Sequence, residues 1–513
     1  MKIHYLAMLV ALVALAGARA QTRPATAPAP PGALYDEAAI ERLVRESMAT
    51  SGAPSYVVGL VVGERLVYAK AFGLADVAQN RPATVDTIYQ TGSLTKTFTA
   101  TLMCALRDDG KLRLDDPVAQ FLPSDVKLPT DPLGAPAITL RHLATHTSGL
   151  PGNPVNRRDV PDSPSVMMPY SVRELYEGLS KTRLDSPTGT RWRYSNLGVG
   201  LLGHALERAG GAGYEPLLKR RLLEPLGMAS TTITLSDEQL ARFATHYWYG
   251  DASRTPRQRW MFGEVCGFGG VASTVPDLAK YVAMYLRQGL PESADGPVVR
   301  GATLRELCGP QRMTSPRWRQ AQALGWFVER TDEDVEMVAH GGEVDGNSSF
   351  LAFAPQLGVG AIVLANTGRD AATIVGDPLI RQMIRVAAAD RSRALELGKT
   401  EKWDEAIEAL QAVLARAPAD GEAWAALGAA RVSAGRHEPA LDAFARAVRL
   451  GHNRMNSAYN AACAAARAGN ADEAFRWLAA ARSHGFRDRE QAETDADLAS
   501  LRGDSRWQDA LPP

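Results

Sequence analysis

Hydrophobic and polar positions follow different patterns in different parts of this chain. From residue 35 to 50 the apolar side chains recur at the spacing of an amphipathic helix. Two runs rich in β-forming residues, 56–62 and 66–72, follow and are joined by Gly63-Glu64-Arg65, which predicts a hairpin. Four further strand-like runs come much later in the chain, at 324–329, 335–340, 348–354 and 359–365.

Strands at both ends of this region, with helices in its middle, indicate the fold class. Runs that follow one another as hairpins favour an antiparallel sheet, and a long insertion between the two sets of strands favours a mostly helical lobe. We therefore predict an α/β fold of the α+β kind for residues 34–390, in which helices flank the antiparallel sheet.

After about residue 390 the chain becomes rich in alanine, and its apolar positions keep the helical spacing. A repeat appears there, because apolar residues of the same kind recur about 34 positions apart. The recurring sets are Ala406, Ala440 and Ala474, and Leu410, Phe444 and Leu478.

The middle repeat unit carries a recognisable pattern. Trp424-x-x-Leu427-Gly428 followed by Ala440-x-x-x-Phe444 resembles the tetratricopeptide repeat (TPR) family. The resemblance implies an all-α, TPR-like domain over residues 391–513 that could recruit a protein partner. A plain helical bundle is the alternative.

The first residues have the three-part form of a signal peptide. A basic start precedes an apolar run, and Ala18-Arg19-Ala20 forms a cleavage site before Gln21. We expect residues 1–20 to be removed, residues 21–33 to act as a Pro/Ala-rich linker, and the product to be exported. Stable membrane insertion is not expected after cleavage, since the run is too short to span a bilayer; an uncleaved N-terminal anchor is the alternative.

Charge and cysteine content exclude several classes of partner. Basic and acidic residues each number 57, so no positive excess exists to bind nucleic acid. The four cysteines have no Cys-x-x-Cys spacing, which gives no indication of a zinc or redox site. We expect no metal and no cofactor, and disulfide pairing stays open.

Ser93 is the candidate nucleophile. Turn-forming residues precede it and an apolar helical pattern follows, so Ser93 should lie at a helix N-terminus with Lys96 on the same face. An unpaired backbone N–H there can stabilise developing negative charge, and a lysine shielded from water can have a pKa low enough to take the hydroxyl proton. Ser124-Asp125-Val126-Lys127 matches the same Ser-x-x-Lys pattern, but it lies in a Pro-rich loop and we interpret it as coincidence.

Two further segments carry compatible chemistry in the same order along the chain. Tyr194-Ser195-Asn196 offers a phenol for proton transfer and an amide for a substrate carbonyl. His340-Gly341-Gly342 ends a predicted strand, where glycines let a substrate lie against the strand edge.

Together these motifs resemble the class C β-lactamase, D-Ala-D-Ala peptidase and esterase family, whose three motifs are Ser-x-x-Lys, Tyr-x-Asn and Lys-Thr-Gly or His-x-Gly. The stretches 138–151 and 269–278 also look characteristic of it. The resemblance implies Ser93 as the acylated residue, Lys96 and Tyr194 as the proton-transfer pair, and Asn196 as a substrate contact. Which of Lys96 and Tyr194 is the general base stays open.

The resemblance also implies an oxyanion hole and a substrate preference. The hole would consist of the backbone N–H groups of Ser93 and of Glu343, just past Gly342. His340 stands where β-lactamases have a lysine, and a largely neutral imidazole binds a carboxylate more weakly. We therefore expect ester, peptide or amide cleavage rather than efficient β-lactam hydrolysis, in a bacterial periplasm or outside the cell.

Other enzyme and site classes find less support. His142 and His146 have the spacing of a zinc helix but lack the adjacent glutamate of metalloproteases, and no Gly-x-Ser-x-Gly elbow occurs. We assign both histidines a structural role. The remaining functional alternatives are a β-lactamase or D-Ala-D-Ala carboxypeptidase, and a binding or cell-wall sensor protein that acylates without turnover.

Overall fold

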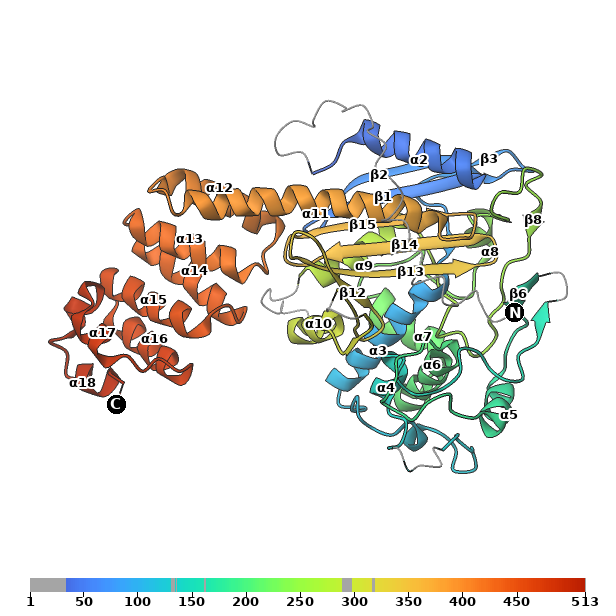
Figure 1. The fold of residues 1–513 in the computed structure, drawn as a ribbon, viewed down its shortest axis with the longest axis horizontal. Coiled ribbons are helices and arrows are strands. Elements are labelled where there is room, and N and C mark those ends of the chain that lie inside the picture. The colour runs from blue at the N-terminus through green and yellow to red at the C-terminus, as the bar shows by residue number, and fades with distance from the viewer. Residues whose placement is uncertain are drawn as a thin grey trace.

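The computed structural model describes residues 34–130, 134, 136–160, 163–287, 298–315 and 319–512. The predicted signal peptide (residues 1–20) and the predicted linker (residues 21–33) therefore lie outside the described residues. Figure 1 shows a sheet with helices on both faces and, at its side, an extension built from helices.

A nine-stranded sheet organises the first part. Its strand pairings are all antiparallel, and β1 pairs with β15, so the N-terminal hairpin joins the edge of the later strands. The predicted antiparallel sheet is thus confirmed. In spatial order the strands are β10 (Arg312–Met313), β11 (Gln320–Gln322), β12 (Phe327–Arg330), β13 (Glu336–Val344), β14 (Asn347–Ala354), β15 (Val359–Ala365), β1 (Ser55–Val62), β2 (Arg65–Asp76) and β3 (Arg81–Pro82).

Helices cover both faces of the sheet because the central strands are apolar on both sides. Tyr56, Val58 and Leu60 pack under α2 (Glu37–Ser51) and α11 (Ala371–Leu397), and the alternate β1 residues belong to a second core shared with the lobe. The helix α9 (Val275–Leu286) contributes to that second core. Successive side chains of β1 point to opposite faces of the sheet and therefore contribute to two separate hydrophobic cores.

The predicted helical lobe forms between β2 and β10 and continues the second core away from the sheet. Short two-stranded pairs, β4 (Tyr89–Gln90) with β9 (Ala272–Ser273), β5 (Asp159–Val160) with β6 (Ser163–Met167), and β7 (His246–Tyr247) with β8 (Pro256–Arg257), tie its loops together. Its helices are α3 (Thr95–Asp108), α4 (Leu140–Ala144), α5 (Val172–Lys181), α6 (Asn196–Gly210), α7 (Tyr214–Leu218), α8 (Asp237–Ala241) and α10 (Gly301–Cys308), with short turns η3 (Val118–Phe121) and η4 (Lys219–Leu223).

The regular elements of the described C-terminal part are all helices. Ala406, Ala440 and Ala474 are fully buried, which agrees with the periodicity of their sequence. Its elements are α12 (Trp403–Arg416), α13 (Gly421–Ser433), α14 (His437–Arg449), α15 (Arg454–Arg467), α16 (Ala471–Ser483), α17 (Arg489–Thr494), η5 (Ala496–Leu501) and α18 (Trp507–Ala510).

The two parts meet along a shared helix. α11 packs on β14 and β15 and continues past residue 390 to contact α12. The turn between β14 and β15 touches the end of α12 so closely that a side chain on Gly358 would lie 1.9 Å from the carbonyl oxygen of Arg416.

No helix among the described residues is long and apolar enough to cross a membrane. All four cysteines are buried free thiols.

Candidate active site

Ser93 lies in the turn η2 (Gly92–Leu94), which leads directly into α3. This agrees with the predicted helix N-terminus. Gly92 has φ +54°, and a side chain there would meet the backbone nitrogen and oxygen of Glu343 at 2.8 and 2.7 Å. A glycine at position 92 therefore lets the turn that carries Ser93 touch the backbone of β13.

Lys96 is buried beside Ser93. It is 1% exposed, and its Nζ donates hydrogen bonds to Ser93 Oγ (2.9 Å) and to the carbonyl oxygen of Phe268 (2.7 Å). Nζ also lies 4.8 Å from the centre of the Tyr194 ring. Because burial penalises the ammonium form, the pKa of Lys96 is lowered well below its ordinary value.

The Tyr-x-Asn segment reaches this lysine from the start of α6. Ser195 caps the helix by accepting a hydrogen bond from the N–H of Gly198 (2.8 Å), which fixes the residues on both sides of it. Tyr194 thereby faces Lys96, and the side-chain amides of Asn196 and Asn153 meet at 3.0 Å. Asn196 occupies the first position of α6, as expected for a residue placed by this cap.

His146 is a residue of this site for which sequence reasoning found no functional role. Its ring lies 4.4 Å, centre to centre, from that of Tyr194, and its Nδ1 accepts a hydrogen bond from the N–H of Ser195 (3.2 Å). Burial and the nearby Lys96 charge lower its pKa well below the ordinary value. The only sequence signal was its position inside the characteristic 138–151 stretch. His142, by contrast, takes part in the capping box of α4.

The third predicted segment lies on β13, opposite the turn that carries Ser93. A side chain on Gly342 would lie 1.9 Å from the carbonyl oxygen of Thr91 and 2.9 Å from the nitrogen of Leu94, so the strand and the turn are in direct backbone contact. β12 pairs with β13 only as far as Ala339, which leaves the stretch from His340 onward to face the turn. Glu343 contributes its backbone here, while its carboxylate accepts a hydrogen bond from the N–H of Arg369 (2.9 Å).

His340 is buried at this edge. Burial is the main cause that lowers its pKa to about 3, and the charge of Lys96 adds to it, so the imidazole is neutral and close to the lysine. A chain of ring contacts runs along one wall of the site, from His340 to Phe327 (5.2 Å), to Trp192 (6.3 Å) and to His146 (6.4 Å).

The loop that carries Phe268 and Val271 supports the turn of Ser93 through hydrogen bonds. Thr91 donates hydrogen bonds from both its N–H (2.9 Å) and its hydroxyl (2.8 Å) to the carbonyl oxygen of Val271. The N–H of Val271 in turn donates to the hydroxyl of Thr95 (3.0 Å). The characteristic 269–278 stretch thus holds the turn that presents Ser93.

The arrangement unites the predicted chemistry in one place. A hydroxyl lies in hydrogen-bond contact with an amine of lowered pKa, a phenol ring lies beside that amine, and a strand edge faces the hydroxyl. These groups suit nucleophilic catalysis with proton transfer.

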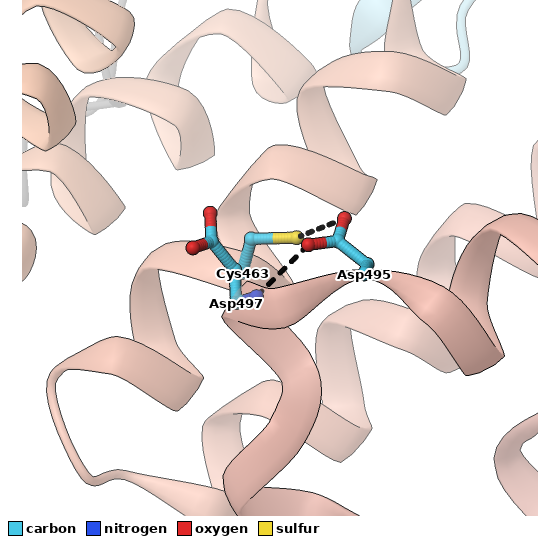
Figure 2. Close-up of side chains that lie close together, drawn as sticks. All are labelled: Cys463, Asp495 and Asp497. Carbon is cyan, nitrogen blue, oxygen red and sulfur yellow. Dashed lines mark hydrogen bonds between the residues drawn. The ribbon is translucent and has the colours of Figure 1, made fainter.

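A second cluster of reactive side chains lies far along the chain, where Cys463, Asp495 and Asp497 place ligand atoms within 4.8 Å of one another (Figure 2). It is the one such group among the described residues. Asp495 already accepts hydrogen bonds from Tyr459 (2.8 Å) and from the N–H of Asp497 (2.9 Å), and Asp497 pairs with Arg467 (2.9 Å). Burial raises the pKa of Cys463, so it remains a thiol. These contacts cap η5 and leave no reason to assign a metal.

Comparisons with known proteins agree with this geometry. D-alanyl-D-alanine-carboxypeptidase/endopeptidase AmpH of Escherichia coli strain K12 is 28% identical over 327 residues, which cover 61% of this chain and 80% of that protein. Penicillin-binding protein 4 of Amycolatopsis lactamdurans is 29% identical, with 60% and 79% covered. The octameric penicillin-binding protein homologue from Pyrococcus abyssi superposes with a TM-score of 0.57 at 27% identity, with 67% and 77% covered.

A family model covers the sheet and the lobe together. The Beta-lactamase model matches residues 40–382, a span that contains all three motifs and ends before α12. The chain therefore belongs to the Beta-lactamase family.

Proposed function

We propose that this chain is an exported serine hydrolase that forms an acyl-enzyme on Ser93 and cleaves an ester, peptide or amide. The observation that carries the proposal is the hydrogen bond between Ser93 Oγ and Nζ of the buried Lys96 (2.9 Å). Burial lowers the pKa of this lysine, which favours the neutral amine that must accept the hydroxyl proton.

The proposed reaction has two halves. In the first, Ser93 Oγ attacks the substrate carbonyl while its proton passes to Lys96 or Tyr194, and the same pair returns a proton to the leaving group. In the second, a water molecule repeats the attack on the acyl-enzyme and releases the acid. The N–H groups of Ser93 and Glu343 stabilise the negative charge on the carbonyl oxygen, and the Asn196 amide binds a carbonyl group of the substrate.

His340 supports a preference for uncharged substrates. A lysine at this position would attract a carboxylate, whereas an imidazole with a pKa of about 3 carries no charge at neutral pH. We therefore propose esterase or peptidase activity of the class C-like type ahead of efficient β-lactam hydrolysis. The second candidate is a β-lactamase or D-Ala-D-Ala carboxypeptidase, and the name of the Escherichia coli relative favours the carboxypeptidase.

The remaining parts of the chain suggest a location and a partner. The pattern of residues 1–20 supports export, and N-terminal sequencing of the secreted protein should then begin at Gln21. We propose that residues 391–513 form a TPR-like domain that recruits a protein partner, based on the repeat whose alanines are buried in α12, α14 and α16.

Labelling with a fluorophosphonate tests the nucleophile. The full chain should take up the label and hydrolyse p-nitrophenyl esters, and Ser93→Ala should do neither. Ser124→Ala, in the second Ser-x-x-Lys sequence, is the matched control and should behave as wild type. Label on the Ser93→Ala protein would exclude this nucleophile, and stable acylation without turnover would favour the sensor alternative.

A further inference from the structure

The imidazole of His340 has a defined tautomer. Its Nδ1 lies in hydrogen-bond contact with the carbonyl oxygen of Gly341. A carbonyl oxygen only accepts, so Nδ1 carries the hydrogen and Nε2 presents a lone pair. A neutral His340 is thus a hydrogen-bond acceptor at Nε2.

That acceptor has no partner within the described part of the chain. Nε2 is buried and receives no hydrogen bond, although His340 is only 3% exposed. Buried polar atoms are paired in the great majority of cases, so an unpaired one inside a reaction site calls for an external donor.

Neighbouring donors are already engaged elsewhere. The indole N–H of Trp192 donates to Gln322 Oε1 (3.1 Å), and Lys96 Nζ donates to Ser93 and Phe268. Phe327, in ring contact with His340, has no donor to offer. These donors are therefore engaged with other acceptors, and the Nε2 lone pair is left without a donor among the described residues.

We propose that Nε2 of His340 is a specificity determinant that accepts a hydrogen bond from a substrate N–H or O–H. The site then selects neutral substrates with an amide or hydroxyl donor next to the scissile bond over substrates with a free carboxylate there. A carboxylate brings only acceptor atoms to this lone pair, and a buried acceptor pair without a hydrogen is unfavourable. This inference rests on the proposed hydrolase function and specifies its substrate class.

Three thioesters with one acyl group test the inference. N-acetyl-D-alanine is joined to mercaptoacetamide, to methyl mercaptoacetate or to mercaptoacetate, so the substrates differ only in a carboxamide, a methyl ester or a carboxylate. Thiol release gives kcat/KM for each. We expect kcat/KM for the carboxamide to exceed that for the methyl ester about ten-fold, because one additional hydrogen bond contributes an effect of this size. The carboxylate should have the lowest kcat/KM.

Variants assign the preference to the imidazole. His340→Phe keeps a ring but removes the acceptor, so the carboxamide and the methyl ester should become equal. His340→Gln retains an acceptor oxygen and should restore part of the preference, and His340→Lys should favour the carboxylate. His142→Phe, at a histidine outside the site, is the control and should leave the wild-type order unchanged.

The outcomes separate the two proposals. Equal rates for carboxamide and methyl ester in the wild type, a faster carboxylate, or a preference that persists in His340→Phe would overturn the inference while leaving the hydrolase intact. Absence of both turnover and fluorophosphonate labelling would refute the proposed function itself. If the label binds but no thioester is cleaved, the preference is measured instead as the degree to which each thioester protects Ser93 against labelling. Equal protection by all three thioesters would overturn the inference.

Discussion

The chain contains two Ser-x-x-Lys sequences with the same spacing and opposite surroundings. Ser93 lies in η2 and Lys96 in the first turn of α3, where the lysine is 1% exposed and hydrogen-bonded to the serine. Ser124 and Lys127 follow the short turn η3 in a loop without regular structure, and both are exposed to solvent. The residue types are identical, so the pattern alone does not determine the chemistry.

The difference lies in what surrounds each pair. A helix places residues three apart on one face, and no helix performs this task at Ser124. Apolar and aromatic neighbours remove water from Lys96 and lower its pKa, and β13 adds a backbone edge opposite Ser93. Burial and the second backbone segment therefore distinguish the proposed catalytic pair from its counterpart, and both can be removed experimentally.

Removal of the buried amine should have the largest effect. Lys96→Met keeps the length and apolar character of the side chain but eliminates proton transfer, so kcat/KM for a p-nitrophenyl ester should fall about 10³-fold. Lys127→Met, at the exposed counterpart, should change it less than about two-fold. Comparable losses in the two variants would show that burial does not distinguish the two sites.

A change that separates β13 from the turn η2, which carries Ser93, should cause the next largest loss of kcat/KM. A side chain on Gly342 would overlap the carbonyl oxygen of Thr91 at 1.9 Å, whereas one on Gly341 meets its nearest atom at an ordinary 3.5 Å. We expect Gly342→Ala to lower kcat/KM about 100-fold and to cost about 1–3 kcal/mol in the free energy of unfolding. Gly341→Ala should resemble wild type in both assays, and equal behaviour of the two variants would contradict the predicted contact.

Much of the fold could be predicted because its signals are local. The runs 56–62 and 66–72 became β1 and β2, and the four later runs match β12 to β15 within a few residues. Long-range pairing was not visible in these patterns: nothing in the residues themselves shows that β1 pairs with β15, about 300 positions away. The continuation of α11 across residue 390 also escaped prediction, because a composition change does not require a helix to end.

The site was predictable as far as its motifs reach. Ser93, Lys96, Tyr194 and His340 meet as expected from their order along the chain. His146 was not predicted to be part of the site. Its place there depends on a hydrogen bond with Ser195, which is distant in the sequence, and no motif spacing links these two residues. Its main-chain φ of +58° is likewise a tertiary feature of the loop.

The burial of His340 near Ser93 should also be measurable, because this histidine takes up a proton when the protein unfolds at mildly acidic pH. His340 has a pKa of about 3 in the folded protein, against about 6.5 for a solvated histidine. Between these values the unfolded chain binds a proton that the folded chain does not, so stability falls as the pH is lowered. His340→Phe should reduce this slope by up to about 1.4 kcal/mol per pH unit between pH 5.5 and 4.5.

Urea unfolding at the two pH values measures the slope directly. His484, exposed in the C-terminal part, provides the control, and His484→Asn should leave the slope as in wild type. His146 and His246 also have lowered pKa values and contribute to the slope in every variant, so only the difference between proteins is interpreted. An unchanged slope in His340→Phe would mean that the imidazole titrates normally in the folded protein.

Changes to the exposed Ser-x-x-Lys pair, Ser124 and Lys127, should have the smallest effect. Ser124→Ala combined with Lys127→Gln removes the hydroxyl and the amine of the second Ser-x-x-Lys sequence, and both side chains lie in solvent. Exposed substitutions away from caps and cores change stability by less than about 0.5 kcal/mol, and esterase activity should stay within about two-fold of wild type. Thermal unfolding and ester turnover of the double variant test this. A large loss of activity would mean that the loop after η3 contributes to the reaction, and the burial criterion that separates the two lysines would then be insufficient.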